Sequence, residues 1–361
     1  MPRRLRTKDP DFEAAFQALV EARRETDEDV SAAVAAIIAD VRARGDAALI
    51  DHTRRFDRLT LTPQRLRIGA EEIAAAVKEC DPETLSALRL AAERIEDFHR
   101  RQLPEDLRYD DRDGVSLGVR WTAMGAVGLY VPGGAAAYPS SVLMTALPAR
   151  VAGVGRVAMA VPAPDGVLNP LVLAAAEIAG VEEIYRVGGA QAVAALAYGT
   201  QTIAPVDKVV GPGGLHVAAA KRQVFGHCGV DLIAGPSEIL VVADGLNDPA
   251  WIAADLLAQA EHDAAAQAVL MTDDGGFAAA VIEEAAMLLR TLDRADIAGA
   301  SWEAHGAVIE LADLGQAVPL IDRLAPEHLA LAVADPEPLA AQVRNAGAIF
   351  LGRLTPEAIG D

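Results

Sequence analysis

The sequence predicts an α/β protein made of two parallel-sheet units and an N-terminal helical segment. Short apolar runs of strand length alternate with helical patterns over residues 126–351, and strands that alternate with helices imply a parallel sheet. Of the 361 residues, 52% are hydrophobic but only 4% are aromatic. The cores are therefore expected to consist of Ala, Val, Leu and Ile, as in strands buried on both faces. This length suits about two domains.

Charge and cysteine usage limit the partners. The net charge of -20 excludes nucleic acid and anionic membranes as expected partners, because both need a basic surface. No apolar run approaches the ~20 residues that cross a bilayer, and the N-terminus lacks the apolar segment of a secretory signal. Cys80 and Cys228 match no CxxC pattern, so neither a disulfide framework nor a cysteine zinc site is expected. We expect a cytoplasmic protein that binds a small molecule.

The first part of the chain is predicted to be helical. Apolar residues recur at helical spacing through residues 11–103, and a break near Asp81-Pro82 predicts two helices within 70–101. Asp113-Gly114 predicts the tip of a hairpin, with residues 115–121 and 126–131 as the flanking strands. The helical segment carries no evident chemistry, so we expect it to serve packing and assembly.

Two series of alternating elements follow, and each is Rossmann-like. The first has expected strands at 156–161, 183–187 and 207–211 and helices at 141–153, 168–179, 190–198 and 214–224. The second has expected strands at 238–243, 267–272, 306–310, 329–333 and 347–351 and helices at 249–262, 276–291 and 315–324. We assign residues 1–128 and 236–361 to a first domain, with 129–235 as an inserted second domain.

Glycine-rich turns follow several of the expected strands. They are VPGGAAAYPSS (131–141), VGGAQA (187–192) and VVGPGG (209–214). Each opens a helix, whose N-terminus can receive an anion, although tight α/β turns need the same residues. No G-x-G-x-x-G is present, so the pattern alone does not predict dinucleotide binding.

A polar pair lies near the end of the expected helix 249–262. Gln259 and His262 are three residues apart and so share a face, with Asp255 on or beside it. Because most of this helix is apolar, both side chains need partners, since an unpaired buried polar group costs about 1–3 kcal/mol. A hydrogen-bonded core histidine and a metal site are both compatible with this pattern.

Two later positions can carry chemistry. Glu327 and His328 lie between a helix and a strand, and adjacent carboxyl and imidazole groups can share acid–base work; a surface turn is the alternative. Asp361 follows the expected strand at 347–351, so its carboxylate is expected at the C-terminal edge of that strand, where open α/β sheets bind ligands.

Eight segments, in this order, together resemble the histidinol dehydrogenases and cover nearly everything from Tyr109 onward. They are LYVPGGAAAYPSSVLM (129–144), YRVGGAQAVAALAYGT (185–200), VDKVVGPG (206–213), AAAKR (218–222), DLIAGPSEILVVAD (231–244), DLLAQAEHD (255–263), LAPEHLAL (324–331) and GAIFLGRLTPEAIGD (347–361). The resemblance implies a zinc-dependent homodimer that oxidises L-histidinol to L-histidine in two NAD-dependent steps through an aldehyde.

The resemblance also implies roles for individual residues. Glu327 and His328 would be the catalytic acid–base pair. One zinc ion per subunit would be bound by Gln259, His262 and Asp361. The substrate would contact Ser237, Gln259, His262, His328 and Asp361. NAD would contact Tyr130, Gln191 and Gly214.

The sequence departs from the family pattern in two places. Gly214 stands where members usually have Asn, with His216 where an aromatic residue is common, so one side-chain contact to NAD is expected to be lost. Family members also continue beyond Asp361 with a tail that supplies a last metal-ligating histidine and a substrate-binding glutamate. We therefore expect weak metal binding and little turnover. A dehydrogenase of another primary alcohol and a noncatalytic chain are the alternatives.

Overall fold

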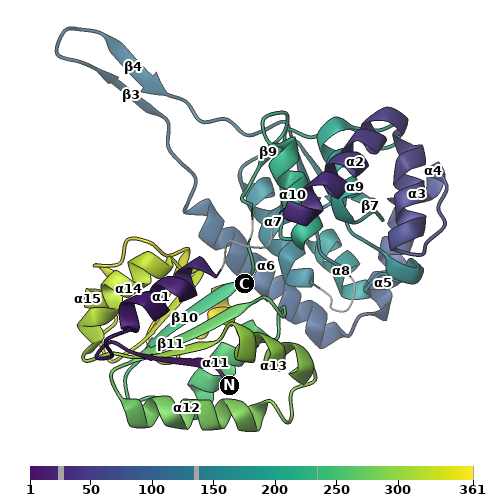
Figure 1. The fold of residues 1–361 in the computed structure, drawn as a ribbon. Coiled ribbons are helices and arrows are strands. Elements are labelled where there is room, and N and C mark those ends of the chain that lie inside the picture. Colours follow the sequence, from purple (N-terminus) through teal and green to yellow (C-terminus); the bar gives the residue numbers. More distant parts are fainter. Residues whose placement is uncertain (23–27, 134–137, 234, 361) are drawn as a thin grey trace. The chain divides into compact units, whose positions relative to one another are not determined.

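The computed structural model describes residues 1–22, 28–133, 138–233 and 235–360, and the side chains of residues 28 and 29 are not described. The chain forms two compact units (Figure 1). The terminal unit comprises Met1–Thr26 and Gly235–Asp361, and the inserted unit comprises Asp27–Ala234. No helix within the described residues is both long and apolar enough to cross a membrane.

The terminal unit contains a parallel sheet of six strands within the residues that the structure describes. In spatial order these strands are β1 (Arg3–Arg6), β12 (Ala307–Glu310), β11 (Gln267–Thr272), β10 (Glu238–Ala243), β13 (His328–Ala332) and β14 (Ala348–Leu351). His328 pairs with Ile239 on one side and with Ala348 on the other. The amino ends of β10, β13 and β14 therefore lie together.

Helices bury both faces of this sheet, which explains the uninterrupted apolar runs in its strands. They are α1 (Phe12–Glu21), α11 (Pro249–Ala260), α12 (Gly275–Leu288), α13 (Ala295–Ala304), α14 (Ala317–Leu324) and α15 (Glu337–Ala340), with 3-10 turns η2 (Leu314–Gln316) and η3 (Glu357–Gly360). Ile239 and Val241 pack in one core with α11, α12 and α13. Leu240 and Val242 point to the other face, where α1 and α14 supply the core.

The inserted unit contains a sheet of six described strands in the order β2 (Arg67–Ile68), β7 (Glu183–Tyr185), β6 (Arg156–Ala160), β5 (Ala126–Tyr130), β8 (Lys208–Val210) and β9 (Gly229–Val230). All neighbouring strands are parallel except β2, which runs antiparallel to β7. A separate hairpin of β3 (Leu107–Asp110) and β4 (Ser116–Val119) is exposed along both strands.

Helices also cover the sheet of the inserted unit. They are α2 (Glu28–Arg44), α3 (Asp46–Phe56), α4 (Pro63–Leu66), α5 (Ala70–Glu79), α6 (Pro82–Arg100), α7 (Pro139–Val151), α8 (Pro170–Ala179), α9 (Gly189–Tyr198) and α10 (Leu215–Val224), with the 3-10 turn η1 (Pro164–Gly166). Residues of α2, α3, α9 and α10 share one core, and residues of α5, α6, α7 and α8 share the other.

The two sheets have the same strand order. The first strand of each alternating series is central, the next two lie on one side of it, and the last two lie on the other. The order therefore reverses between β5 and β8 in the inserted unit and between β10 and β13 in the terminal unit. Such switch points are where the carboxyl ends of parallel strands leave a crevice for a ligand.

Several sequence-based expectations need correction. Residues 28–128 belong to the inserted unit and not to the first domain as predicted, because helical periodicity reveals a buried face but not the sheet that it covers. The hairpin is present, but its first strand is Leu107–Asp110, and Ala126–Tyr130 joins the inserted sheet. The helix predicted over 249–262 ends at Ala260, so His262 lies beyond it.

Candidate active site

The three residues expected to contact NAD lie at the carboxyl edge of the inserted sheet. Tyr130 is the last residue of β5, Gln191 lies in the first turn of α9 after β7, and Gly214 caps α10 after β8. Tyr130 and Gly214 therefore flank the switch point between β5 and β8. The structure thus brings this predicted set to the edge where an α/β sheet binds a nucleotide.

Tyr130 and Gln191 are both buried at this edge. The hydroxyl oxygen of Tyr130 accepts a hydrogen bond from the Gly189 N–H at 3.0 Å. Burial raises the pKa of Tyr130 to about 12, so the phenol keeps its proton near neutral pH and can donate it to a ligand oxygen.

The loop after β8 lies close against β5 because Gly211 has no side chain. Its φ is +115°, and a Cβ there would be 2.1 Å from the Tyr130 carbonyl oxygen. The Gly211 N–H donates to Asp231 Oδ2 at 2.7 Å, and its carbonyl accepts from Lys221 Nζ at 2.9 Å. Lys221 is buried and forms an ion pair with Asp231. These contacts hold the loop in one conformation beside the switch point.

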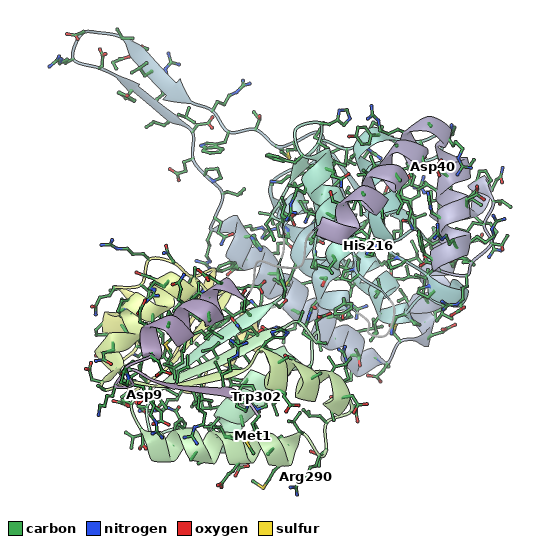
Figure 2. The ribbon with its side chains drawn as sticks, viewed as in Figure 1. Met1, Asp9, Asp40, His216, Arg290 and Trp302 are labelled. Carbon is green, nitrogen blue, oxygen red and sulfur yellow. The ribbon has the colours of Figure 1, made fainter. Side chains whose placement is uncertain are left out.

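The helices that follow strands β5, β7 and β8 in the inserted unit begin without a capping side chain. In the described residues, the N-cap positions of α7, α9 and α10 (Tyr138, Gly188 and Gly214) provide no side-chain hydrogen bond to the first turn. Gly214 and His216 at the start of α10 are exposed (Figure 2 labels His216). Uncapped N–H groups and the positive end of the helix dipole favour an anion such as a phosphate.

The expected catalytic residues lie at the amino edge of the terminal sheet. His328 is the first residue of β13, Glu327 precedes it, and Ser237 directly precedes β10. Glu327 Oε2 accepts the backbone N–H of Glu238 at 3.2 Å, which ties the turn before β13 to the start of β10. The structure therefore brings Ser237, Glu327 and His328 to one edge of the sheet.

Gln259 reaches this edge from the last turn of α11. The helix starts at the carboxyl edge after β10 and runs back, so that its end lies near the start of β13. Gln259 is 3% exposed, and its Oε1 lies 3.3 Å from Nδ1 of His328. The buried glutamine thus has its partner in the predicted base.

Two residues that can bind a cation, Gln259 and His262, lie at or just beyond the end of α11. The carbonyl end of a helix carries partial negative charge and favours cations, and the amide oxygen of Gln259 and the imidazole of His262 are donors that zinc accepts. His262 is exposed and lies just beyond the helix. Asp361, the third expected ligand, lies outside the described residues. No three described His, Cys, Asp or Glu side chains form a group that could hold a metal ion.

Two acidic side chains lie near Gln259 at this site: Glu357, for which no role was predicted, and Asp255, for which orienting the ligands was only an alternative to a structural role. Glu357 in η3 places Oε1 3.0 Å from Nδ1 of His328. Asp255 lies one turn before Gln259 on α11, and burial, with a smaller contribution from the nearby Glu357, raises its pKa to about 6. Only the position of Asp255 on the helix face with Gln259 signalled it in the sequence. For Glu357 the sequence offered no signal, because the contact depends on the chain turning back after β14.

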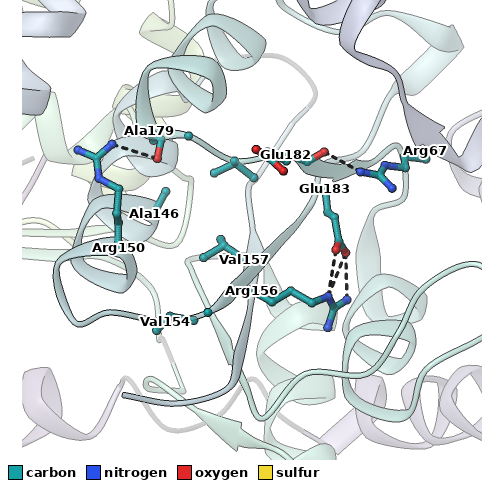
Figure 3. A pocket seen from close by; sticks show the side chains of 12 residues that line it. Arg67, Ala146, Arg150, Val154, Arg156, Val157, Ala179, Glu182 and Glu183 are labelled. Carbon is teal, nitrogen blue, oxygen red and sulfur yellow. Dashed lines mark hydrogen bonds and ion pairs between the residues drawn. The ribbon is translucent and has the colours of Figure 1, made fainter. Parts of the chain in front are cut away.

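The amino edge of the inserted sheet has a different character. A pocket there is lined by Arg67, Arg150 and Arg156, together with Glu182 and Glu183 (Figure 3). Arg156 pairs with Glu183 at 3.1 Å, Arg67 donates to the Glu182 carbonyl, and Arg150 donates to the Ala179 carbonyl at the end of α8. The arginines thus satisfy carboxylates and helix-end carbonyls, so this pocket is not a candidate site.

Comparison with known proteins decides the family. Residues 20–361 match the histidinol dehydrogenase family. The chain belongs to the histidinol dehydrogenase family. It is 64% identical over 362 residues to the histidinol dehydrogenase of Rhodospirillum rubrum and 63% identical over 361 residues to that of Ruegeria pomeroyi; both alignments cover 100% of this chain and 83% of the relative. The predicted family and oxidoreductase activity are thereby confirmed.

A solved structure supports the same family and the α/β fold. The structure of histidinol dehydrogenase from Elizabethkingia anophelis superposes with a TM-score of 0.94 at 33% identity, covering 99% of this chain and 82% of that chain. A histidinol dehydrogenase acts on a small molecule, which agrees with the acidic composition. The cofactors, the metal and the roles of individual residues stay predictions.

Proposed function

We propose that this histidinol dehydrogenase oxidises L-histidinol to L-histidine in two NAD-dependent steps through the aldehyde, and that it binds zinc. The observation that carries the proposal is the contact between His328 and Gln259 at 3.3 Å. It joins the expected base to the expected metal and substrate ligands in a chain that is 64% identical to a named histidinol dehydrogenase.

His328 acts as the base in the first oxidation. The alcohol carbon gives up a hydride, which NAD accepts, and the hydroxyl gives up its proton, which Nε2 of His328 receives. An imidazole suits this transfer because it takes up and releases protons near neutral pH. The position of His328 at the open start of β13, partly exposed, leaves its ring accessible to a substrate.

Glu327 acts in the second oxidation, which needs water to add to the aldehyde carbon. The exposed Glu327 is held by the backbone N–H of Glu238, and it takes a proton from the attacking water. The resulting hydrate loses a second hydride to NAD and becomes the carboxylic acid. Ser237, beside Glu238 at the same edge, orients the substrate.

Gln259 and His262, with Asp361, are proposed to hold zinc. The ion would orient the amine and imidazole of the substrate by accepting their lone pairs. Gln259 fits this role because its carbonyl oxygen already points to the base and lies at the negative end of α11. The remaining steps depend on His328 and Glu327.

Tyr130, Gln191 and Gly214 are proposed to bind NAD on the inserted unit. The uncapped N-termini of α9 and α10 support a pyrophosphate there, and the buried phenol of Tyr130 supplies a hydrogen-bond donor. Because Gly214 has no side chain, the backbone of this turn and not a side chain contacts the cofactor.

The protein is further proposed to be a cytoplasmic homodimer. Leu107 pairs with Val119 and Tyr109 pairs with Leu117 across the β3–β4 hairpin, and all four are about half exposed. An isolated two-stranded hairpin with such an apolar face is marginally stable in water, so a second copy would stabilise it. Cys80 and Cys228 are both free thiols, as a reducing compartment favours.

The proposal is tested by supplying L-histidinol, NAD and zinc and following NADH and L-histidine together. Two NADH should form for each histidine produced. Formation of NADH from another primary alcohol, with none from histidinol, would overturn the proposed substrate. Failure of a chelator to lower the rate would overturn the role of the metal.

A further inference from the structure

Glu357 is the side chain of the last described segment that turns inward. Among residues 356–360, all of which are described, Glu357 alone is not exposed, and 17% of its side chain is accessible. Arg353, a few residues earlier, pairs with Asp244 after the carboxyl end of β10. The chain therefore runs from the carboxyl edge of the terminal sheet back to its amino edge, where Glu357 meets His328.

The contacts of Glu357 and Gln259 fix which ring nitrogen of His328 carries the hydrogen. Nδ1 lies 3.0 Å from Oε1 of Glu357 and 3.3 Å from Oε1 of Gln259. A carboxylate oxygen and an amide carbonyl oxygen only accept hydrogen bonds, so Nδ1 must donate. In the neutral ring the lone pair is then on Nε2.

The surroundings of His328 also restrict its ring orientation. Phe350 meets the ring edge-on, with centroids 5.9 Å apart and an interplanar angle of 68°. Glu357 is close enough to Asp255 to affect its charge state, and two neighbouring carboxyl groups disfavour each other.

We propose that Glu357 is a positioning residue that holds the His328 ring with its hydrogen on Nδ1, so that Nε2 faces the substrate hydroxyl as the proton acceptor. This inference rests on the proposed role of His328 as base. In the first oxidation the hydroxyl proton moves to Nε2 while the Nδ1–H stays bonded to Glu357, which stabilises the imidazolium that forms. The hydride goes to NAD, so charge and atoms balance.

The ring tautomer provides a test that needs no turnover. In protein labelled with nitrogen-15 at histidine, the His328 signals are assigned by their loss in His328→Asn. At a pH where the ring is neutral, the parent should carry its hydrogen on Nδ1. Glu357→Ala should lower the share of Nδ1–H and raise that of Nε2–H, although Gln259 Oε1 still accepts from Nδ1. Glu357→Gln, which keeps an acceptor oxygen, should retain more of the parent signal. The parent tautomer in Glu357→Ala would overturn the proposal.

Steady-state kinetics provide the second readout. Glu357→Ala should lower kcat about 100-fold and Glu357→Gln about tenfold, with KM for histidinol within about threefold of the parent, because general-base catalysis contributes about 10²–10⁴-fold. A role limited to holding η3 against the sheet would lower thermal stability while leaving kcat within about threefold, and this result would contradict positioning.

Glu337→Gln is the matched control. Glu337 is an exposed residue of α15 in the same unit, and its replacement should change neither tautomer nor kcat. If the parent makes no NADH from histidinol but Glu357→Ala still shifts the tautomer, the proposed reaction is refuted, whereas the effect of Glu357 on the His328 ring is still supported. A parent that is active while neither readout responds would refute the positioning role alone.

Discussion

In the inserted unit candidate site residues end or follow strands, whereas in the terminal unit the candidate catalytic residues and Ser237 precede or start strands. Tyr130 ends β5 and Gly214 follows β8, but His328 begins β13 and Ser237 precedes β10. The strand order of the two sheets is the same. The same topology therefore presents candidate chemistry at opposite edges, and topology alone does not decide which edge is used.

Helix ends explain the difference. In the terminal unit the helices after β10 and β11 are capped by Asp248 and Asp274, so carboxylates already occupy their positive ends. In the inserted unit glycines precede α9 and α10 and supply no capping side chain, and at α9 the Gly189 N–H donates to the Tyr130 hydroxyl. The negative end of α11 instead carries Gln259, which suits a cation or a substrate amine. At these helices, capping thus distinguishes the edge proposed to bind an anion from the edge proposed to bind a cation.

The largest effect is expected from removing the base at the amino edge of the terminal sheet. His328→Asn should lower kcat with histidinol by about 1,000-fold, because it removes the imidazole that is proposed to take the hydroxyl proton. The matched control is Lys208→Gln, since Lys208 begins β8, the strand that corresponds to β13. Initial rates of NADH formation measure both. Equal losses of kcat in the two variants would show that the amino edge of the terminal sheet has no special role in catalysis.

The next effect is expected from giving the inserted unit an acidic cap like those of the terminal unit. Gly214 has an ordinary φ of -66°, and no atom lies within 4 Å of a Cβ placed there, so Gly214→Asp should fold. Its carboxylate should occupy the anion position and weaken NAD binding about 100-fold, or about 2.7 kcal/mol. Calorimetric titration with NAD measures this, with Gly214→Ala as control within about threefold. Unchanged affinity in Gly214→Asp would place NAD elsewhere.

A smaller effect concerns Asp255, the partly buried acid one turn before Gln259. Burial raises the pKa of Asp255 to about 6, above the unfolded value of about 3.9. The folded state therefore binds more protons between these pH values, and stability is lost as the pH rises through 6. Asp255→Asn should unfold like the parent at pH about 4 but be more stable by about 1–2 kcal/mol at pH about 8, after allowance for partial solvent screening.

Denaturant unfolding without added metal measures the effect of Asp255. Asp335→Asn, which removes an exposed carboxyl of the same unit, should show no such dependence on pH. If the free energy of unfolding differs between the parent and Asp255→Asn by the same amount at both pH values, the charge of Asp255 is not the cause.

The smallest effect is expected from removing a cap in the terminal unit. The side chain of Asp248 accepts the Ala250 N–H at 2.9 Å, and loss of such a cap costs about 1 kcal/mol. Asp248→Ala should therefore lower the free energy of unfolding by about 1 kcal/mol and leave NAD affinity unchanged. Thermal unfolding and calorimetry measure these quantities. Stronger NAD binding in this variant would show that the terminal unit also offers an anion site once uncapped.

Local signals predicted much of the fold because they act within one element. Asp81 accepts the Thr84 N–H and Pro82 starts α6, as the break near Asp81-Pro82 predicted. The turn before His328 also followed from its own residues. The packing partners of residues 28–128 could not be predicted, because an apolar helix face matches any apolar sheet. The contact between Glu357 and His328 joins residues 29 positions apart through a reversal of the chain, which no local pattern encodes.

The amino-acid sequence alone determined the alternation of strands and helices, the glycines and aspartates at helix starts and, through its ordered motifs, the family. These depend on local backbone preference and on residue identity. Only the tertiary structure decided that α11 returns to the amino edge, that Gln259 meets His328 there, and that Glu357 joins them. Such contacts depend on where whole elements end in space, and that is set by packing between segments distant in the chain.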